Sequence, residues 1–195
     1  MPTLTVIAGA NGSGKSTLTR QLERPILLID PDAIAKELNP TDPASAAIAA
    51  GRQALALAQQ YIQSESSFVV ETTFAGSTYI KLMREAKSRG WLVILMYIGI
   101  DNPNMNVLRV ADRVKLGGHD VPREDILRRY ERSLANLNKA AKIVDELILY
   151  DNSTNAGHQI LAATLFQGGC ANESYKTVIY VPELPSWVAK ANLNL

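Results

Sequence analysis

The chain has 195 residues, of which 47% are hydrophobic and 20% are charged, and its formal net charge is +1. This length predicts one domain with a substantial core, and the composition excludes a disordered chain. The balanced charge argues against a surface that holds nucleic acid or membrane by bulk charge. The one cysteine, Cys170, excludes an internal disulfide, and its setting in QGGCANES favours a turn over a reactive thiol.

The chain contains no apolar run long enough to span a membrane. Its first residues lead straight into a predicted strand, without the basic start and apolar stretch of a signal peptide. We therefore expect a cytoplasmic protein with no membrane partner.

The first predicted strand, residues 4–8, runs directly into GANGSGKST, which fits the P-loop pattern G-x-x-x-x-G-K-[ST] in full. Glycines there let several backbone N–H groups point at phosphate oxygens. Lys15 would neutralise the β- and γ-phosphates of a nucleotide, and the Ser16 hydroxyl would be a ligand of Mg²⁺. The predicted nucleotide contacts are Gly9, Ala10, Asn11, Gly12, Ser13, Gly14, Lys15, Ser16 and Thr17.

The second predicted strand, residues 26–29, ends in LLIDPD. Ligands of an open parallel sheet sit beyond the carboxyl ends of its strands, so Asp30 and Asp32 should emerge on the same rim as the P-loop. A carboxylate there can accept the proton of an attacking hydroxyl. Either residue can instead cap the helix that starts near Ala33, and position alone does not choose between the two roles.

A long helix is predicted over residues 44–65, with an apolar stripe of Ile48, Gly51, Leu55, Ala58 and Ile62. The third strand, residues 68–71, follows and places Glu71 and Thr72 on the same rim. Glu71 could orient Mg²⁺ through water or hold substrate hydroxyls. The alternative is an exposed acid at the end of a strand.

A helix over residues 76–89 and a strand over residues 92–99 come next, and Gly90 ends the helix. Asp101 follows that strand in the manner of a Walker-B aspartate. We favour a structural role for Asp101, because Asp101-Asn102-Pro103 is typical of a helix start.

Two predicted helices, which begin at Asn102-Pro103 and near Pro122, carry the arginines that we single out: Arg109, Arg113, Arg128, Arg129 and Arg132. Arg109 and Arg113 are four residues apart and can lean toward one target. Arginines that close over a transferring phosphoryl group compensate the charge on its oxygens. The glycine break VKLGGHDV between the helices suits a movable lid, and His119 within it favours a structural polar role.

Some of these arginines must be ordinary solvated helix charge. Glu124 and Asp125 lie four residues before Arg128 and Arg129, which predicts two favourable i,i+4 pairs.

A fifth strand is predicted over residues 147–150, followed by a hairpin of residues 159–166 and 176–181, and Trp187 is expected to anchor the last turn. The pattern as a whole predicts a single α/β domain over residues 1–195. Its core is a P-loop NTPase fold with a five-stranded parallel sheet flanked by helices, and residues 151–195 form a small appendage.

With these residues laid out, the chain resembles the zeta-toxin family of P-loop kinases, in particular the branch labelled "predicted ABC-type ATPase". The matching stretches are GANGSGKST, LLIDPD, AGRQALA, SFVVETTFAG, RVADRVKLGGHDVPREDILRRYERSLANL and DNS, in the family's order. The resemblance implies the strand order 2-3-1-4-5 and the transfer of phosphate from ATP, with Mg²⁺, to the 3′-hydroxyl of the amino sugar in UDP-N-acetylglucosamine. It also implies an antitoxin protein as a partner.

The resemblance also implies residue roles. Lys15 would hold the phosphates, Ser16 the metal, and Asp32 would be the catalytic base. Substrate contacts would come from Glu71, Thr72 and Arg52, charge stabilisation from Arg113 and Arg129, and further lid residues would be Arg109, Arg128 and Arg132. The chain departs from the better-known toxins at Asn11, where they carry Pro, and at Thr72, where they carry Gly.

Two other functions stay open at this point. A nucleotide-dependent switch or ATPase would use water as the acceptor, or no acceptor at all. A nucleic-acid kinase would require a basic groove, which the balanced charge argues against. The ABC-type label itself has no support in the residues, since the chain has no LSGGQ-like signature.

Overall fold

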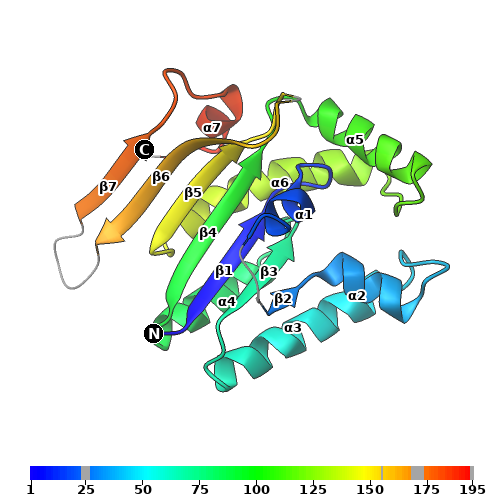
Figure 1. Ribbon diagram of the computed structural model, residues 1–195, viewed down its shortest axis with the longest axis horizontal. Helices are drawn as coiled ribbons and strands as arrows, with labels where there is room; N and C mark the ends of the chain where they lie inside the picture. The colour runs from blue at the N-terminus through cyan, green and yellow to red at the C-terminus, as the bar shows by residue number, and fades with distance from the viewer. Residues whose placement is uncertain (23–26, 155, 168–173, 194–195) are drawn as a thin grey trace.

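The computed structural model describes residues 1–22, 27–154, 156–167 and 174–193, and within them seven strands form one sheet (Figure 1). The strands are β1 Thr3–Ala8, β2 Leu28–Ile29, β3 Phe68–Thr72, β4 Leu92–Gly99, β5 Glu146–Asp151, β6 Gln159–Gln167 and β7 Ser174–Ile179. Their order is β2-β3-β1-β4-β5-β6-β7. Strands β1 to β5 pair in parallel, which confirms the predicted order 2-3-1-4-5.

The predicted hairpin is confirmed, but it does not stand apart from the sheet as the sequence suggested. Strand β6 pairs antiparallel with β5, and β7 pairs antiparallel with β6, so the hairpin extends the five parallel strands to seven. We propose from this shared sheet that the described residues fold as one domain. Ile26 of the second predicted strand, and Cys170 with its predicted turn, lie outside the described residues.

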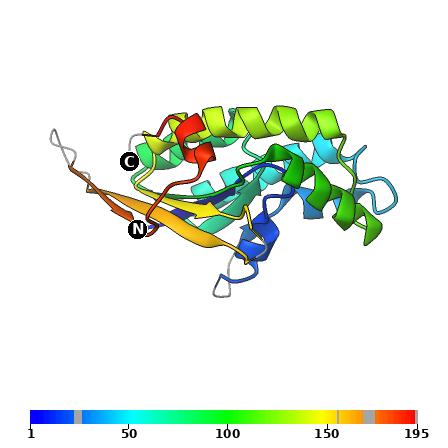
Figure 2. The same cartoon turned by 90° about the horizontal axis from the view of Figure 1, so that it is seen from above.

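Seven helices accompany the sheet in the described residues: α1 Lys15–Thr19, α2 Pro31–Leu38, α3 Ala47–Gln63, α4 Thr78–Ser88, α5 Pro103–Lys115, α6 Arg123–Ala141 and α7 Ser186–Lys190. Seen from above, α6 and α7 lie on one side of the sheet and the short α1 lies on the other (Figure 2). The start of α5 is the predicted one, because the Asn102 side chain accepts a hydrogen bond from the backbone N–H of Asn104. In the part of the chain described, no helix is long and apolar enough to cross a bilayer.

Both faces of the central strands are covered, which explains their nearly continuous runs of Val, Ile and Leu. All five residues of β3 are buried. The main core lies between the sheet and helices α3, α4 and α6. A smaller core lies under α1, around Ile7, Leu18, Val69 and Ile98.

Helix α3 buries a different stripe from the one predicted. Its buried residues are Ala50, Ala54, Ala58 and Ile62, whereas Ile48 is 74% exposed and Gly51 is exposed as well. The small alanine side chains let α3 pack close to its neighbours. This close packing stabilises the fold more than burial of the larger Ile48 side chain would. The predicted stripe is therefore wrong at its first positions, and those residues instead face a cavity described below.

Candidate phosphoryl-transfer site

The carboxyl ends of the parallel strands meet at one edge of the sheet and bring distant segments together. Ala8, the last residue of β1, pairs in register with Thr72 of β3 and Tyr97 of β4. The P-loop after β1 therefore lies beside the segments that follow β3 and β4, and the turn after β2 lies one strand further along the same edge (Figure 1). This is the edge at which ligands bind in open α/β sheets.

The Lys15 side chain folds back over the P-loop and binds its first two residues. Its Nζ donates hydrogen bonds to the carbonyl oxygens of Gly9 at 2.9 Å and Ala10 at 3.1 Å. Burial of the ammonium lowers the pKa of Lys15, and the nearby carboxylates of Asp32 and Glu71 oppose that shift. Asp32 and Lys15 line the same cavity, which places this carboxylate close to the P-loop lysine.

Helix α5 packs directly on the P-loop at Gly12. The φ angle of Gly12 is 75°, and a Cβ there would lie 2.6 Å from the backbone oxygen of Asn106. Only glycine tolerates both conditions. The buried Asn106 side chain donates to the carbonyl oxygen of Asn11 at 2.7 Å, so α5 also fixes the loop by a hydrogen bond.

The two acids of LLIDPD have different roles. Asp30 is the N-cap of α2, and its Oδ1 accepts a hydrogen bond from the backbone N–H of Asp32 at 2.9 Å. Within the described residues, no hydrogen bond engages the Asp32 carboxylate. The sequence left open which of the two acids caps the helix, and the structure shows that Asp30 does. The Asp32 carboxylate is exposed and can contact a ligand.

Glu71 is buried rather than exposed at the strand end, with 4% of its surface accessible. Its Oε2 accepts a hydrogen bond from the Ser16 hydroxyl at 2.9 Å. Burial raises the pKa of the Glu71 carboxyl, and the hydroxyls of Thr19 and Ser16 oppose the shift only in part. A buried carboxylate beside the Ser16 hydroxyl matches the oxygen ligands that Mg²⁺ prefers.

Replacement of Glu71 by Gln should raise the thermal midpoint at pH 7 by roughly 2–5 °C, because it removes a poorly compensated buried charge and keeps an oxygen that can accept from Ser16. In the folded protein the pKa of Glu71 lies above its ordinary value of 4.5. The buried negative charge therefore destabilises the wild-type fold fully at pH values above that raised pKa, and this destabilisation disappears as the pH falls toward 4.5. Thermal unfolding should be measured between pH 7 and pH 4.5, and the difference in thermal midpoint between Glu71→Gln and the wild type should shrink as the pH falls. A difference that does not change with pH would contradict a charge effect.

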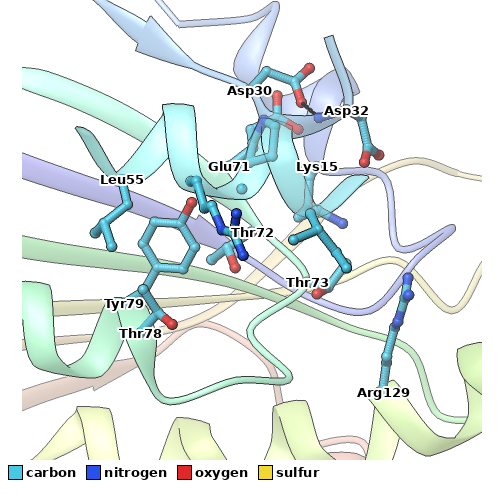
Figure 3. A pocket seen from close by; sticks show the side chains of 14 residues that line it. Lys15, Asp30, Asp32, Leu55, Glu71, Thr72, Thr73, Thr78, Tyr79 and Arg129 are labelled. Carbon is cyan, nitrogen blue, oxygen red and sulfur yellow. Dashed lines mark hydrogen bonds between the residues drawn. The ribbon is translucent and has the colours of Figure 1, made fainter. Parts of the chain in front are cut away.

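A cavity of about 490 Å³ opens beside Lys15, Asp30, Asp32 and Glu71 (Figure 3). Its other walls carry hydroxyl groups, two arginines and a short apolar strip. The hydroxyl residues are Thr72, Thr73, Thr78 and Tyr79; the arginines are Arg52 and Arg129; the apolar strip is Ile48 and Leu55 of α3. Burial raises the pKa of the Tyr79 hydroxyl to about 12, so it stays protonated and can donate to a ligand.

Of the three clustered arginines on α6, Arg129 is the one that reaches the cavity. Its Nη1 donates to the Asn11 side-chain oxygen at 3.1 Å, which ties α6 to the P-loop. Figure 3 shows the Arg129 side chain extending from its helix toward the other residues of the cavity. Arg128 pairs with Asp125 at 2.8 Å on an exposed surface, and Arg132 is exposed. The predicted pair of Asp125 with Arg129 is present at 3.6 Å.

The predicted pair of Glu124 with Arg128 is wrong. Arg128 binds Asp125 instead, one turn back at i,i+3, because Asp125 lies between Arg128 and Arg129 on the helix surface. Asp125 thus holds both arginines, and Glu124 is exposed.

Arg109 and Arg113 contact different segments. The Nη2 of Arg113 donates to the carbonyl oxygen of His119 at 2.8 Å, and this bond links the glycine break to the end of α5. The Nη2 of Arg109 donates to the carbonyl oxygen of Thr154 at 3.3 Å, in the turn after β5. Arg113 also lines a second cavity, of about 760 Å³, between α2 and the glycine break, and Asp32 lies in the wall of both cavities.

The sequence of this chain matches the family model described as "Zeta toxin" over residues 1–159. The chain belongs to the zeta-toxin family. A relative from Haemophilus influenzae, described as an uncharacterized protein, is 41% identical over 123 residues, which are 63% of this chain and 88% of the relative.

Two solved structures share the fold of the chain. The complex AvrRxo1-ORF1:ORF2 with ATP contains a chain with 14% identity and a TM-score of 0.69, which covers 85% of this chain. The PezAT chromosomal toxin–antitoxin system of Streptococcus pneumoniae gives 20% identity, a TM-score of 0.61 and 78% coverage. The match takes in 59% of the AvrRxo1 complex chain and 69% of the PezAT chain.

The zeta-toxin motifs did not reveal every residue that shapes this site. Asn106 contacts the P-loop, and its position four residues before the buried Val110 was a signal, because an amide on a buried helix face needs a partner. Thr73, Thr78 and Tyr79 line the cavity with no comparable signal. Asp101 has the structural role that the sequence favoured, although it binds α7 rather than α5: its Oδ1 accepts from the backbone N–H of Trp187 at 2.9 Å.

Proposed function

We propose that this protein is an ATP-dependent kinase of the zeta-toxin type that phosphorylates a hydroxyl of a nucleotide sugar, UDP-N-acetylglucosamine or a related compound. The family and the fold support phosphoryl transfer in general. The observation that carries the finer proposal is the free carboxylate of Asp32, which lies in the wall of a hydroxyl-lined cavity next to Lys15.

The P-loop supplies the grip for the nucleotide. Its inward N–H groups and Lys15 would hold the β- and γ-phosphates of ATP. Mg²⁺ would be held by the Ser16 hydroxyl and, through water, by Glu71, and when bound it would neutralise charge on those phosphates.

Asp32 would act as the general base. Its carboxylate would take the proton from the acceptor hydroxyl as the oxygen attacks the γ-phosphorus and the bond to the bridging oxygen of ADP breaks. Arg129, held at the loop by Asn11, would compensate the negative charge that spreads over the transferring group. Arg113, which lines the second cavity together with Asp32, would support Arg129 in this role.

The acceptor would occupy the cavity of about 490 Å³. Donors and acceptors from Thr72, Thr78 and Tyr79 suit a ligand rich in hydroxyl and amide groups, and the guanidinium of Arg52 suits a phosphate. A site for water alone would need neither this volume nor this lining, which favours transfer over simple hydrolysis.

The direct test is to incubate the protein with ATP and Mg²⁺ and a panel of nucleotide sugars, nucleosides and polar metabolites, and to search by mass spectrometry for a product heavier by one phosphate. We expect such a product from a UDP-linked amino sugar. Slow ADP formation that no added hydroxyl compound changes would favour the ATPase or switch instead.

The partner and the compartment are proposals as well. AvrRxo1-ORF1 is bound to ORF2, and PezAT is a toxin–antitoxin system; a small antitoxin protein is the partner that we propose for this chain. Co-expression with the neighbouring reading frame, followed by co-purification, would test it. The cytoplasmic location stays a prediction from the sequence.

A further inference from the structure

A chain of hydrogen bonds joins the C-terminal helix α7 to the P-loop. At one end, the indole N–H of Trp187 donates to Asp151 Oδ1 at 2.9 Å in buried surroundings. At the other end, the side-chain amide of Asn152 donates to the carbonyl oxygen of Ser13 at 2.8 Å. Because Asp151 and Asn152 are adjacent, one turn after β5 connects α7 with the loop.

The turn after β5 is held from several directions. The Asp151 carboxylate also accepts from the backbone N–H of Ser153 at 3.1 Å and from its hydroxyl at 2.6 Å. The backbone N–H of Asn152 donates to the carbonyl oxygen of Gly99 at 3.0 Å, and the Ser153 hydroxyl accepts from the backbone N–H of Asp101 at 2.9 Å. These bonds leave the Asn152 side chain little freedom to move relative to the sheet.

Trp187 is itself locked in place. Its side chain has 0% exposure and lies on Gly99, where a Cβ would come within 2.2 Å of the indole ring. Its ring centroid is 5.6 Å from that of Tyr97. Asp101 Oδ1 accepts from both the Ser186 hydroxyl, at 3.0 Å, and the Trp187 backbone N–H, at 2.9 Å. Helix α7 is therefore a fixed part of the sheet edge that carries the site.

The geometry points to Trp187 as a positioning residue for nucleotide binding, which acts through Asp151 and Asn152 on the P-loop. The carbonyl of Ser13 and the N–H of Gly14 belong to one planar trans peptide and point in opposite directions. Asn152 holds that carbonyl by its hydrogen bond, and this would leave the Gly14 N–H directed toward the phosphates of a bound nucleotide. Trp187 lies beyond residue 159, where the match to the family model ends, whereas Ser13, Asp151 and Asn152 lie within the matched residues.

The inference rests on the proposed nucleotide binding, and the test measures binding alone. The full-length chain is titrated with ADP and Mg²⁺ by calorimetry at a temperature well below unfolding, so that no acceptor is needed. We expect Asn152→Ala and Trp187→Phe each to weaken ADP binding about threefold to tenfold, the usual effect of one hydrogen bond. If Trp187 acts through Asn152, the double variant should bind no more weakly than Asn152→Ala.

The second tryptophan of the chain provides a matched control. Trp91 is 3% exposed, and its ring centroid is 5.9 Å from that of Phe68. It comes just before β4, whose first residue, Leu92, pairs with Thr3 at the end of β1 opposite to the P-loop. Trp91→Phe should cost comparable stability and leave ADP affinity unchanged. Equal affinities for Trp187→Phe and Trp91→Phe, or additive losses in the double variant, would overturn the positioning role.

The outcomes separate the two proposals. Wild-type protein that binds ADP but phosphorylates no acceptor contradicts the kinase proposal and leaves the comparison of variants intact. Wild-type protein that binds no nucleotide overturns both proposals.

Discussion

Asp32→Asn should lower the rate of phosphoryl transfer by about 10²–10⁴, the usual contribution of general base catalysis. The amide cannot take the proton of the acceptor hydroxyl, although it fills the same space. ADP affinity should stay the same or rise slightly, because a negative charge is removed from the neighbourhood of the phosphates. Single-turnover transfer to the acceptor found in the metabolite panel would measure the rate, and calorimetry would measure the affinity.

Asp30→Ala is the informative counterpart, because Asp30 and Asp32 are two residues apart and have different roles. Loss of the Asp30 cap should cost about 1 kcal/mol of folding stability. Asp32→Asn should leave the thermal midpoint within about 2 °C, as expected for an exposed residue that caps nothing. Full transfer activity in Asp32→Asn would rule out Asp32 as the general base, although the measured transfer would still identify a kinase.

Arg129→Ala should lower the turnover number by about 10³, in the range reported for arginines that stabilise a transferring phosphoryl group. Among Arg128, Arg129 and Arg132, only Arg129 lines the cavity and reaches Asn11 of the P-loop. Arg128→Ala and Arg132→Ala should each cost less than about tenfold, since exposed pairs contribute little. Steady-state kinetics with one acceptor would measure the turnover number of each variant and show which of the three loses the most.

Two further variants sharpen the Arg129 experiment. Arg129→Lys should recover only part of the activity, because an ammonium lacks the planar fork of the guanidinium. Arg123→Ala is the control: Arg123 is an exposed arginine on the same helix and binds Asn104 on α5, away from the cavity. A larger loss in Arg128→Ala or Arg132→Ala than in Arg129→Ala would mean that the lid closes in another arrangement, with a different arginine over the phosphates.

Local features of the chain were readable in advance. The P-loop is a contiguous motif whose glycines and lysine act at fixed spacing, so its place after β1 followed from residues 4–17 alone. The parallel strands were readable because burial on both faces leaves continuous apolar runs. The stripe of α3 was misjudged at Ile48 because a cavity, rather than the core, lies against that part of the helix.

The sequence by itself determined that a phosphate grip and several acids lie on one rim of a parallel sheet, since each follows directly from a strand and its end. It did not determine which acid is free, which arginine reaches the loop, or that Trp187 is linked to Ser13. Those outcomes depend on hydrogen bonds between residues far apart in the chain, such as Asn152 with Ser13. Only the folded arrangement of β5, α6 and α7 around the P-loop brings such partners within bonding distance.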